Sequence, residues 1–124
     1  MFYVLSGQTD TMTPDEGKRA TRKLAAMLRL HGLKPRYALG VFEGKTEHSL
    51  VVPVCELEHH SVIFSHAEHF GQRYVLAVDA HNLATLIACD PSRESEELGY
   101  WVCKGNEVPE GDYTYVAGLY YVCE

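Results

Sequence analysis

The sequence lacks the short motifs that identify most small enzymes. It contains no GxSxG elbow, no P-loop, no GxGxxG segment and no HExxH metal motif. Its four cysteines form no CxxC pair, which excludes zinc-ribbon and thioredoxin-type sites. No apolar run approaches the roughly 20 residues of a membrane helix, and the first residues lack the basic start and long apolar core of a signal peptide. We therefore expect a cytoplasmic protein whose cysteines are free thiols.

Positive charge is scarce in the second half of the chain. Residues 1–54 carry eight Lys/Arg and five Asp/Glu, whereas residues 55–124 carry three and twelve, and the net charge is −6. Seven of the eleven basic residues lie between Lys18 and Arg36. The overall acidity argues against direct nucleic-acid binding. Two regions of opposite charge can instead steer the protein toward a charged protein partner.

The clearest local signal predicts a helix that begins at Pro14. Thr13 is a good N-cap, and Glu16 completes a capping box. Gly32 is typical of the residue just after a helix. The next segment reads as a β-hairpin, with strands at 36–42 and 47–54 and a turn around Gly44. The other expected elements are a strand at 2–6, a helix at 56–70 and strands at 73–78, 83–89, 98–103 and 113–123.

This order of elements predicts an α+β fold in a single domain, residues 1–124. The first six elements follow the order β-α-β-β-α-β, which is typical of a ferredoxin-like antiparallel sheet with both helices on one face. We expect residues 1–90 to form this core. Residues 91–124 would extend it, so that about three C-terminal strands follow the ferredoxin-like unit.

One cluster of residues has the chemistry of a metal site. If residues 55–70 form one helix, Cys55, His59, His66 and His69 lie within about 90° of one another. Thiolate and imidazole both suit zinc. A single helix that supplies every ligand is unusual, however, and boundary histidines commonly pack beside an apolar stripe. We therefore expect the protein to bind no metal and no cofactor. The alternative is a metal site formed by these four residues.

The hairpin carries the best candidates for acid–base chemistry. Glu47 and Ser49 point the same way from one strand, and Glu43 lies in the adjoining turn. A carboxylate pair of this kind could act as general acid and base. Acidic residues around a hairpin turn are also commonly solvated, which is the alternative interpretation.

The C-terminal third combines exposed acids with aromatic residues. Adjacent Tyr120 and Tyr121 must point to opposite faces of a strand, so at least one can reach the surface. Aromatic side chains are enriched at protein interfaces. The predicted binding surface comprises Glu94, Glu96, Glu97, Tyr100, Trp101, Tyr120 and Tyr121, together with Arg22 and Arg29 on the basic face of the first helix.

The hairpin also carries a family resemblance. The pattern Gly40-x-Phe42-x-Gly44-x-x-Glu47-x-Ser49, followed by Phe70–Gly71–Gln72, resembles a family of small uncharacterised domains in phages and proteobacteria. The resemblance covers roughly residues 1–90. It implies a phage or bacterial source, carries over no catalytic residue, and directs attention to Glu47, Ser49 and Gln72 as a ligand site.

These observations favour a small, non-enzymatic, phage-encoded protein that binds and inhibits a host protein in the host cytosol. A nucleic-acid-handling defence complex is a suitable target, which would make the chain an anti-CRISPR type of inhibitor. The alternative is a small nucleotide- or metal-dependent enzyme or ligand-binding domain. Its site would lie near hairpin residues 40–49 and the His-rich helix. A homodimer is a further alternative.

Overall fold

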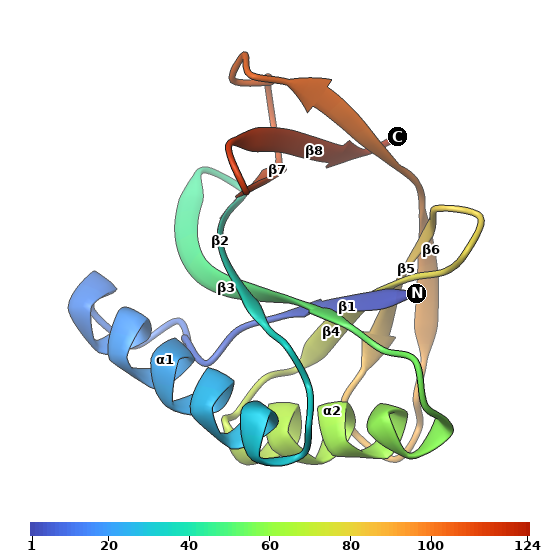
Figure 1. The fold of residues 1–124 in the computed structure, drawn as a ribbon. Coiled ribbons are helices and arrows are strands. Elements are labelled where there is room, and N and C mark those ends of the chain that lie inside the picture. The colour runs from blue at the N-terminus through green and yellow to red at the C-terminus, as the bar shows by residue number, and fades with distance from the viewer.

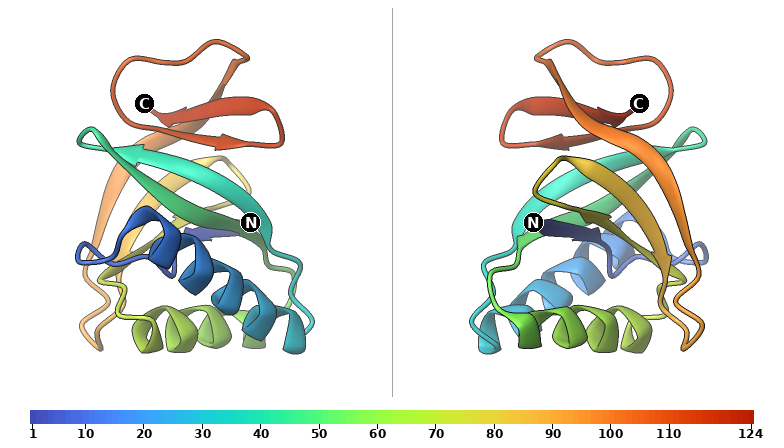
Figure 2. Two further views of the ribbon diagram at one scale, coloured as in Figure 1. Left: turned by 90° about the vertical axis from the view of Figure 1, so that its left-hand side faces the viewer. Right: turned by 90° about the vertical axis from the view of Figure 1, so that its right-hand side faces the viewer.

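The computed structural model describes residues 1–124, and its strands close into an antiparallel barrel. The order around the barrel is β1-β3-β2-β7-β8-β6-β5-β4. Both helices lie against one side of the barrel, and the β7–β8 hairpin lies on the opposite side (Figures 1 and 2). The elements are β1 (Phe2–Leu5), α1 (Pro14–Leu30), β2 (Arg36–Phe42), β3 (Lys45–Pro53), α2 (Leu57–His69), β4 (Tyr74–Val78), β5 (Leu83–Ala88), β6 (Ser95–Gly105), β7 (Tyr113–Val116) and β8 (Leu119–Cys123).

The signals for α1 are confirmed. The Thr13 side chain accepts a hydrogen bond from the Glu16 N–H, and the Glu16 side chain accepts one from the Thr13 N–H, at 3.2 and 3.0 Å. Gly32 follows the helix with φ +82°, a left-handed conformation that favours glycine. Neither helix is long and apolar enough to cross a membrane.

The main core lies between the helices and the outer face of the barrel. Leu24, Leu28, Leu50, Val52 and Ile63 are fully buried there. Fully burying side chains of this size stabilises the fold by about 1.5–3 kcal/mol each. The apolar stripe of α1 therefore holds the helix on β3, and α2 packs on β4 and on β1, where Tyr3 contacts Phe64.

The prediction of a ferredoxin-like fold is wrong, because the strands form a closed barrel and not an open sheet with two edge strands. In that fold the strands next to β3 and β1 would end the sheet. Here β2 pairs with β7 from Ala38↔Val116 to Val41↔Tyr113, and β4 pairs with β5. Strands β5, β6, β8 and β7 then join the two edges. A closed barrel leaves no edge strand unpaired, which removes the aggregation risk of an open sheet.

The C-terminal elements also differ from the prediction. The single strand expected at 113–123 is a hairpin, because Ala117 and Gly118 turn the chain with φ of +52° and +80°. The strand expected at 98–103 is longer, since β6 runs from Ser95 to Gly105. These changes supply the strands that close the barrel.

A close approach between the chain after β1 and helix α1 fixes this end of the barrel. A Cβ on Gly7 would lie 2.6 Å from the carbonyl carbon and oxygen of Ala20. A Cβ on Gly17 would lie 2.3 Å from the Gln8 side chain. Glycine is therefore required at position 7, where the neighbouring atoms are helix backbone, whereas a side chain at position 17 would force the Gln8 side chain to move.

We expect Gly7→Ala to destabilise the protein by about 1–3 kcal/mol, because the new methyl group meets helix backbone that cannot rotate away. Urea unfolding measures this loss. The matched control is Gly40→Ala, whose Cβ would meet its nearest atoms at 3.5 and 3.8 Å, an ordinary contact distance. That control should change stability by no more than about 1 kcal/mol. Equal effects for both variants would contradict the packing argument.

Candidate active site

The inner face of the barrel carries a different set of side chains from the helix-covered outer face. Phe2 and Trp101 make an edge-to-face contact with ring centroids 5.3 Å apart. Their strands, β1 and β6, are not neighbours, so this contact crosses the barrel interior. Tyr121 on β8 stacks on Trp101 at 5.2 Å. All three rings are only half-buried, so solvent reaches this interior. Small barrels can hold one small ligand in such a space.

One row of paired residues runs around the inner face and ends in a carboxylate. Glu47 on β3 pairs with Gly40 on β2, Gly40 pairs with Thr114 on β7, and Thr114 pairs with Tyr121 on β8. Directly paired residues share a face of the sheet. The two central members of the row are small, so little side chain separates Glu47 from the aromatic rings. The row has an acid at one end and the Tyr121 ring at the other, and we call this part of the inner face the Glu47 recess.

The Glu47 carboxylate is half-buried and has no basic partner. Burial raises the pKa of Glu47, the polar Ser6 hydroxyl nearby lowers it, and the nearby Asp10 charge raises it, with a net upward shift. A carboxylate whose ionisation is disfavoured in this way is typical of functional sites. It can hold a cation or accept a proton.

Side chains from three segments fix the strand that carries Glu47. The hydroxyls of Ser6 and Thr21 both donate to the His48 carbonyl, and the His48 N–H donates to the Gln8 side chain at 2.9 Å. Gln72 donates to the Gln8 carbonyl at 2.8 Å. Strand β1 ends at Leu5, so these side chains replace the missing strand-to-strand hydrogen bonds. They hold the Glu47 backbone in place.

The three residues singled out as a ligand site have different places in this arrangement. Glu47 lies in the recess, and buried Ser49 lies on the same inner face, paired with Ala38. Gln72 does not reach the recess through its own side chain, because its amide is bound to the Gln8 backbone. Sequence reasoning missed Ser6, for which the only signal was a polar residue at the end of an apolar strand.

The predicted interface residues do not form one surface. Trp101 and Tyr121 point into the barrel, whereas Tyr120 lies on the outer face against Tyr113 and Tyr115. Tyr100 is exposed. The acids Glu94, Glu96 and Glu97 are exposed along the start of β6, and Arg22 and Arg29 lie on the exposed face of α1.

The Cys55, His59, His66 and His69 alternative is not assembled as a metal centre. No three His, Cys, Asp or Glu side chains in the protein are grouped so that they could hold a metal ion. Cys55 is exposed and precedes α2, whose N-cap is Glu56. His66 instead packs on His31, with ring centroids 5.1 Å apart.

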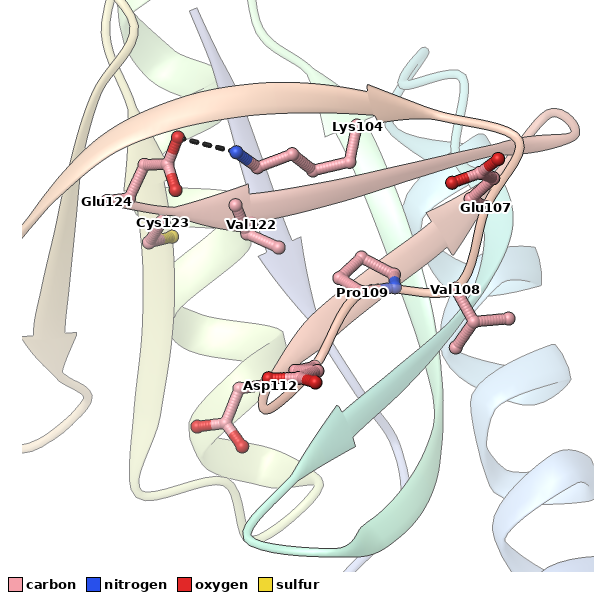
Figure 3. A pocket seen from close by; sticks show the side chains of 9 residues that line it. Lys104, Glu107, Val108, Pro109, Asp112, Val122, Cys123 and Glu124 are labelled. Carbon is pink, nitrogen blue, oxygen red and sulfur yellow. Dashed lines mark hydrogen bonds and ion pairs between the residues drawn. The ribbon is translucent and has the colours of Figure 1, made fainter.

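A hollow of about 570 Å³ lies at the end of β8 and under the 105–112 connection (Figure 3). Its one basic side chain, Lys104, is paired with Glu124 at 2.8 Å (Figure 3). The other charged residues around it are Glu107, Glu110 and Asp112. It lacks the aromatic surface of the barrel interior, so the Glu47 recess is the better candidate for an active site.

One model of a known protein family matches nearly the whole length of the chain. Residues 3–124 match the model of the S-adenosylmethionine lyase family. No curated protein matches the chain in sequence. The match extends through the C-terminal strands, beyond the roughly 90 residues of the resemblance noted in the sequence. It says nothing of phage distribution or of the hairpin pattern, which stay predictions.

This family is an enzyme family, so the expectation of a non-enzymatic inhibitor is wrong, including its anti-CRISPR form. That expectation depended on the absence of standard motifs. A carboxylate placed by barrel closure has no short sequence motif, which explains the error. The enzyme alternative, with a site near residues 40–49, fits the family better.

We expect Glu47→Gln to make the protein more stable than the wild type at pH 7 and above. Because the pKa of Glu47 is raised, wild-type stability falls as the pH rises from the ordinary glutamate value, about 4.3, through the raised value. The variant has no carboxylate at position 47 and does not lose stability in this way. Its stability advantage over the wild type should therefore shrink to zero as the pH falls. Urea unfolding from pH 4 to 8 measures it. The control is Glu43→Gln, which removes a carboxylate of the same hairpin from the exposed turn.

Proposed function

The chain belongs to the S-adenosylmethionine lyase family, and we propose that it is an enzyme that cleaves a carbon–sulfur bond of S-adenosylmethionine. The observation that carries the proposal within the barrel is the half-buried Glu47 carboxylate, which has no basic partner and faces an interior lined by aromatic rings. We assign this interior as the substrate site.

The recess suits the charges and rings of this substrate. S-adenosylmethionine carries a sulfonium cation, an ammonium group and a planar adenine. Trp101 and Tyr121 offer ring faces for stacking or for a cation–π contact. Glu47 offers the negative charge that either cation requires. Gly40, opposite Glu47, leaves space for the bound molecule.

The raised pKa of Glu47 favours a cationic ligand on thermodynamic grounds. No basic side chain of the protein pairs with the Glu47 carboxylate, so a bound cation would stabilise its charged form. By linkage, the substrate lowers the pKa of Glu47, and ionised Glu47 strengthens substrate binding. Substrate binding should therefore weaken as the pH falls through the raised pKa.

A lyase breaks the bond without adding water. The electron pair of the broken carbon–sulfur bond stays on sulfur, so the sulfonium becomes a neutral thioether. The separated carbon is satisfied from within the same molecule, by loss of a proton or by attack of one of its own groups. Glu47 would orient the cationic substrate for this step.

We expect the purified protein to convert S-adenosylmethionine into products whose masses sum to that of the substrate. Mass spectrometry distinguishes this from hydrolysis, whose products together carry one added water. Glu47→Gln should lower kcat/KM by about a hundredfold or more, because the loss of a buried charge contact costs roughly 3 kcal/mol.

The matched control for this experiment is Glu43→Gln, which removes a carboxylate from the same hairpin outside the barrel interior. It should retain activity within about threefold of wild type, the level of a typical surface change of 0.5 kcal/mol or so. No turnover by the folded wild-type protein would contradict the proposed activity. Full activity in Glu47→Gln would contradict the site.

A further inference from the structure

A second cleft lies on the opposite face of the strand that carries Glu47. It has a volume of about 410 Å³ and runs between α1 and the outer face of β2 and β7. Ligand pockets typically fall between about 300 and 1,000 Å³. His48 lines the cleft, whereas its neighbour Glu47 points to the inner face. The two sites are therefore back to back across one strand.

The charge of the cleft is opposite to that of the Glu47 recess. Lys18 and Arg22 are one helical turn apart on α1, and both line the cleft. Neither side chain forms an ion pair or a hydrogen bond within the protein. The His48 ring adds a further nitrogen donor or acceptor. No acidic residue lines the cleft. It therefore suits an anion and disfavours a cationic substrate.

The floor of the cleft is aromatic and apolar. Tyr37, Leu39 and Tyr115 remain 50%, 38% and 36% exposed, so their apolar surface is open to a ligand. Tyr115 pairs with Leu39, so Tyr37 and Tyr115 are diagonal neighbours about 7–8 Å apart at the backbone. Arg29 lies over the Tyr37 ring at 5.7 Å and supports it from the helix side. Two rings so placed can both contact one planar base.

We propose that this cleft binds a mononucleotide, with its base on Tyr37 and Tyr115 and its phosphate between Lys18 and Arg22. A phosphate monoester carries close to two negative charges at neutral pH, which two unpaired cationic side chains can match. The base uses the aromatic floor that a simple anion would leave exposed. The size of the cleft and the net charge of −6 favour a single nucleotide over a nucleic-acid chain.

Calorimetric titration with adenosine 5′-monophosphate tests the proposal, with adenosine and inorganic phosphate as separate ligands. We expect the nucleotide to bind at least about tenfold more tightly than either part, and its affinity to fall as salt rises. Arg22→Glu should weaken nucleotide binding by roughly tenfold or more, because it replaces a charged contact with a repulsive one. Tyr115→Ala should weaken the nucleotide and adenosine alike.

The matched control is Arg19→Glu, an equal charge change on the same helix at a residue that does not line the cleft. Its nucleotide affinity should stay within about twofold of wild type, and thermal unfolding checks that all variants are folded. Glu47→Gln should bind the nucleotide as the wild type does, which separates this site from the proposed lyase activity.

Three results would overturn the assignment. The first is no nucleotide binding at millimolar concentration. The second is equal affinity in Arg22→Glu and Arg19→Glu. The third is tighter binding of a six-nucleotide RNA than of the mononucleotide, which would mean that the surface recognises a chain.

Discussion

The pairing of β2 with β7 is the contact on which the rest of the structure depends. It joins the hairpin strand Arg36–Phe42 to the C-terminal hairpin and closes the sheet. The Asp112 side chain reinforces this junction by accepting a hydrogen bond from the Glu43 N–H at 2.8 Å. Without this closure, Trp101 and Tyr121 would have no interior to share with Phe2 and Glu47. The proposed substrate site is therefore a product of ring closure.

Strand β3 separates two environments of opposite charge. Its alternation places Glu47 toward the barrel interior and His48 toward helix α1. The burial of Glu47 disfavours its charged form. The backbone groups of the next residue, His48, are hydrogen-bonded by side chains. The hydroxyls of Ser6 and Thr21 both donate to the His48 carbonyl, next to Glu47. These hydrogen bonds thus fix the backbone from which Glu47 points inward and His48 points outward.

Local chemistry made much of the first half predictable. The capping box at Thr13, the stop at Gly32 and the 36–54 hairpin all depend on contacts between residues close in sequence. The C-terminal half was less predictable, because Ala117 turns the chain with a positive φ that its residue type does not favour. The site was found only in part. Glu47 and Ser49 stood out on one strand, but Ser6 and the aromatic rings come from segments far away in sequence.

The sequence by itself determined the helices, the first hairpin and the alternation that puts Glu47 and Ser49 on one face, since each follows from backbone geometry over a few residues. Only the tertiary structure decided that this face lies inside a barrel, because the pairing of neighbouring strands does not say whether a sheet stays open or closes. Closure converted the inner face into an interior and buried the Glu47 carboxylate. Its raised pKa follows from that burial, a long-range effect that no local pattern records.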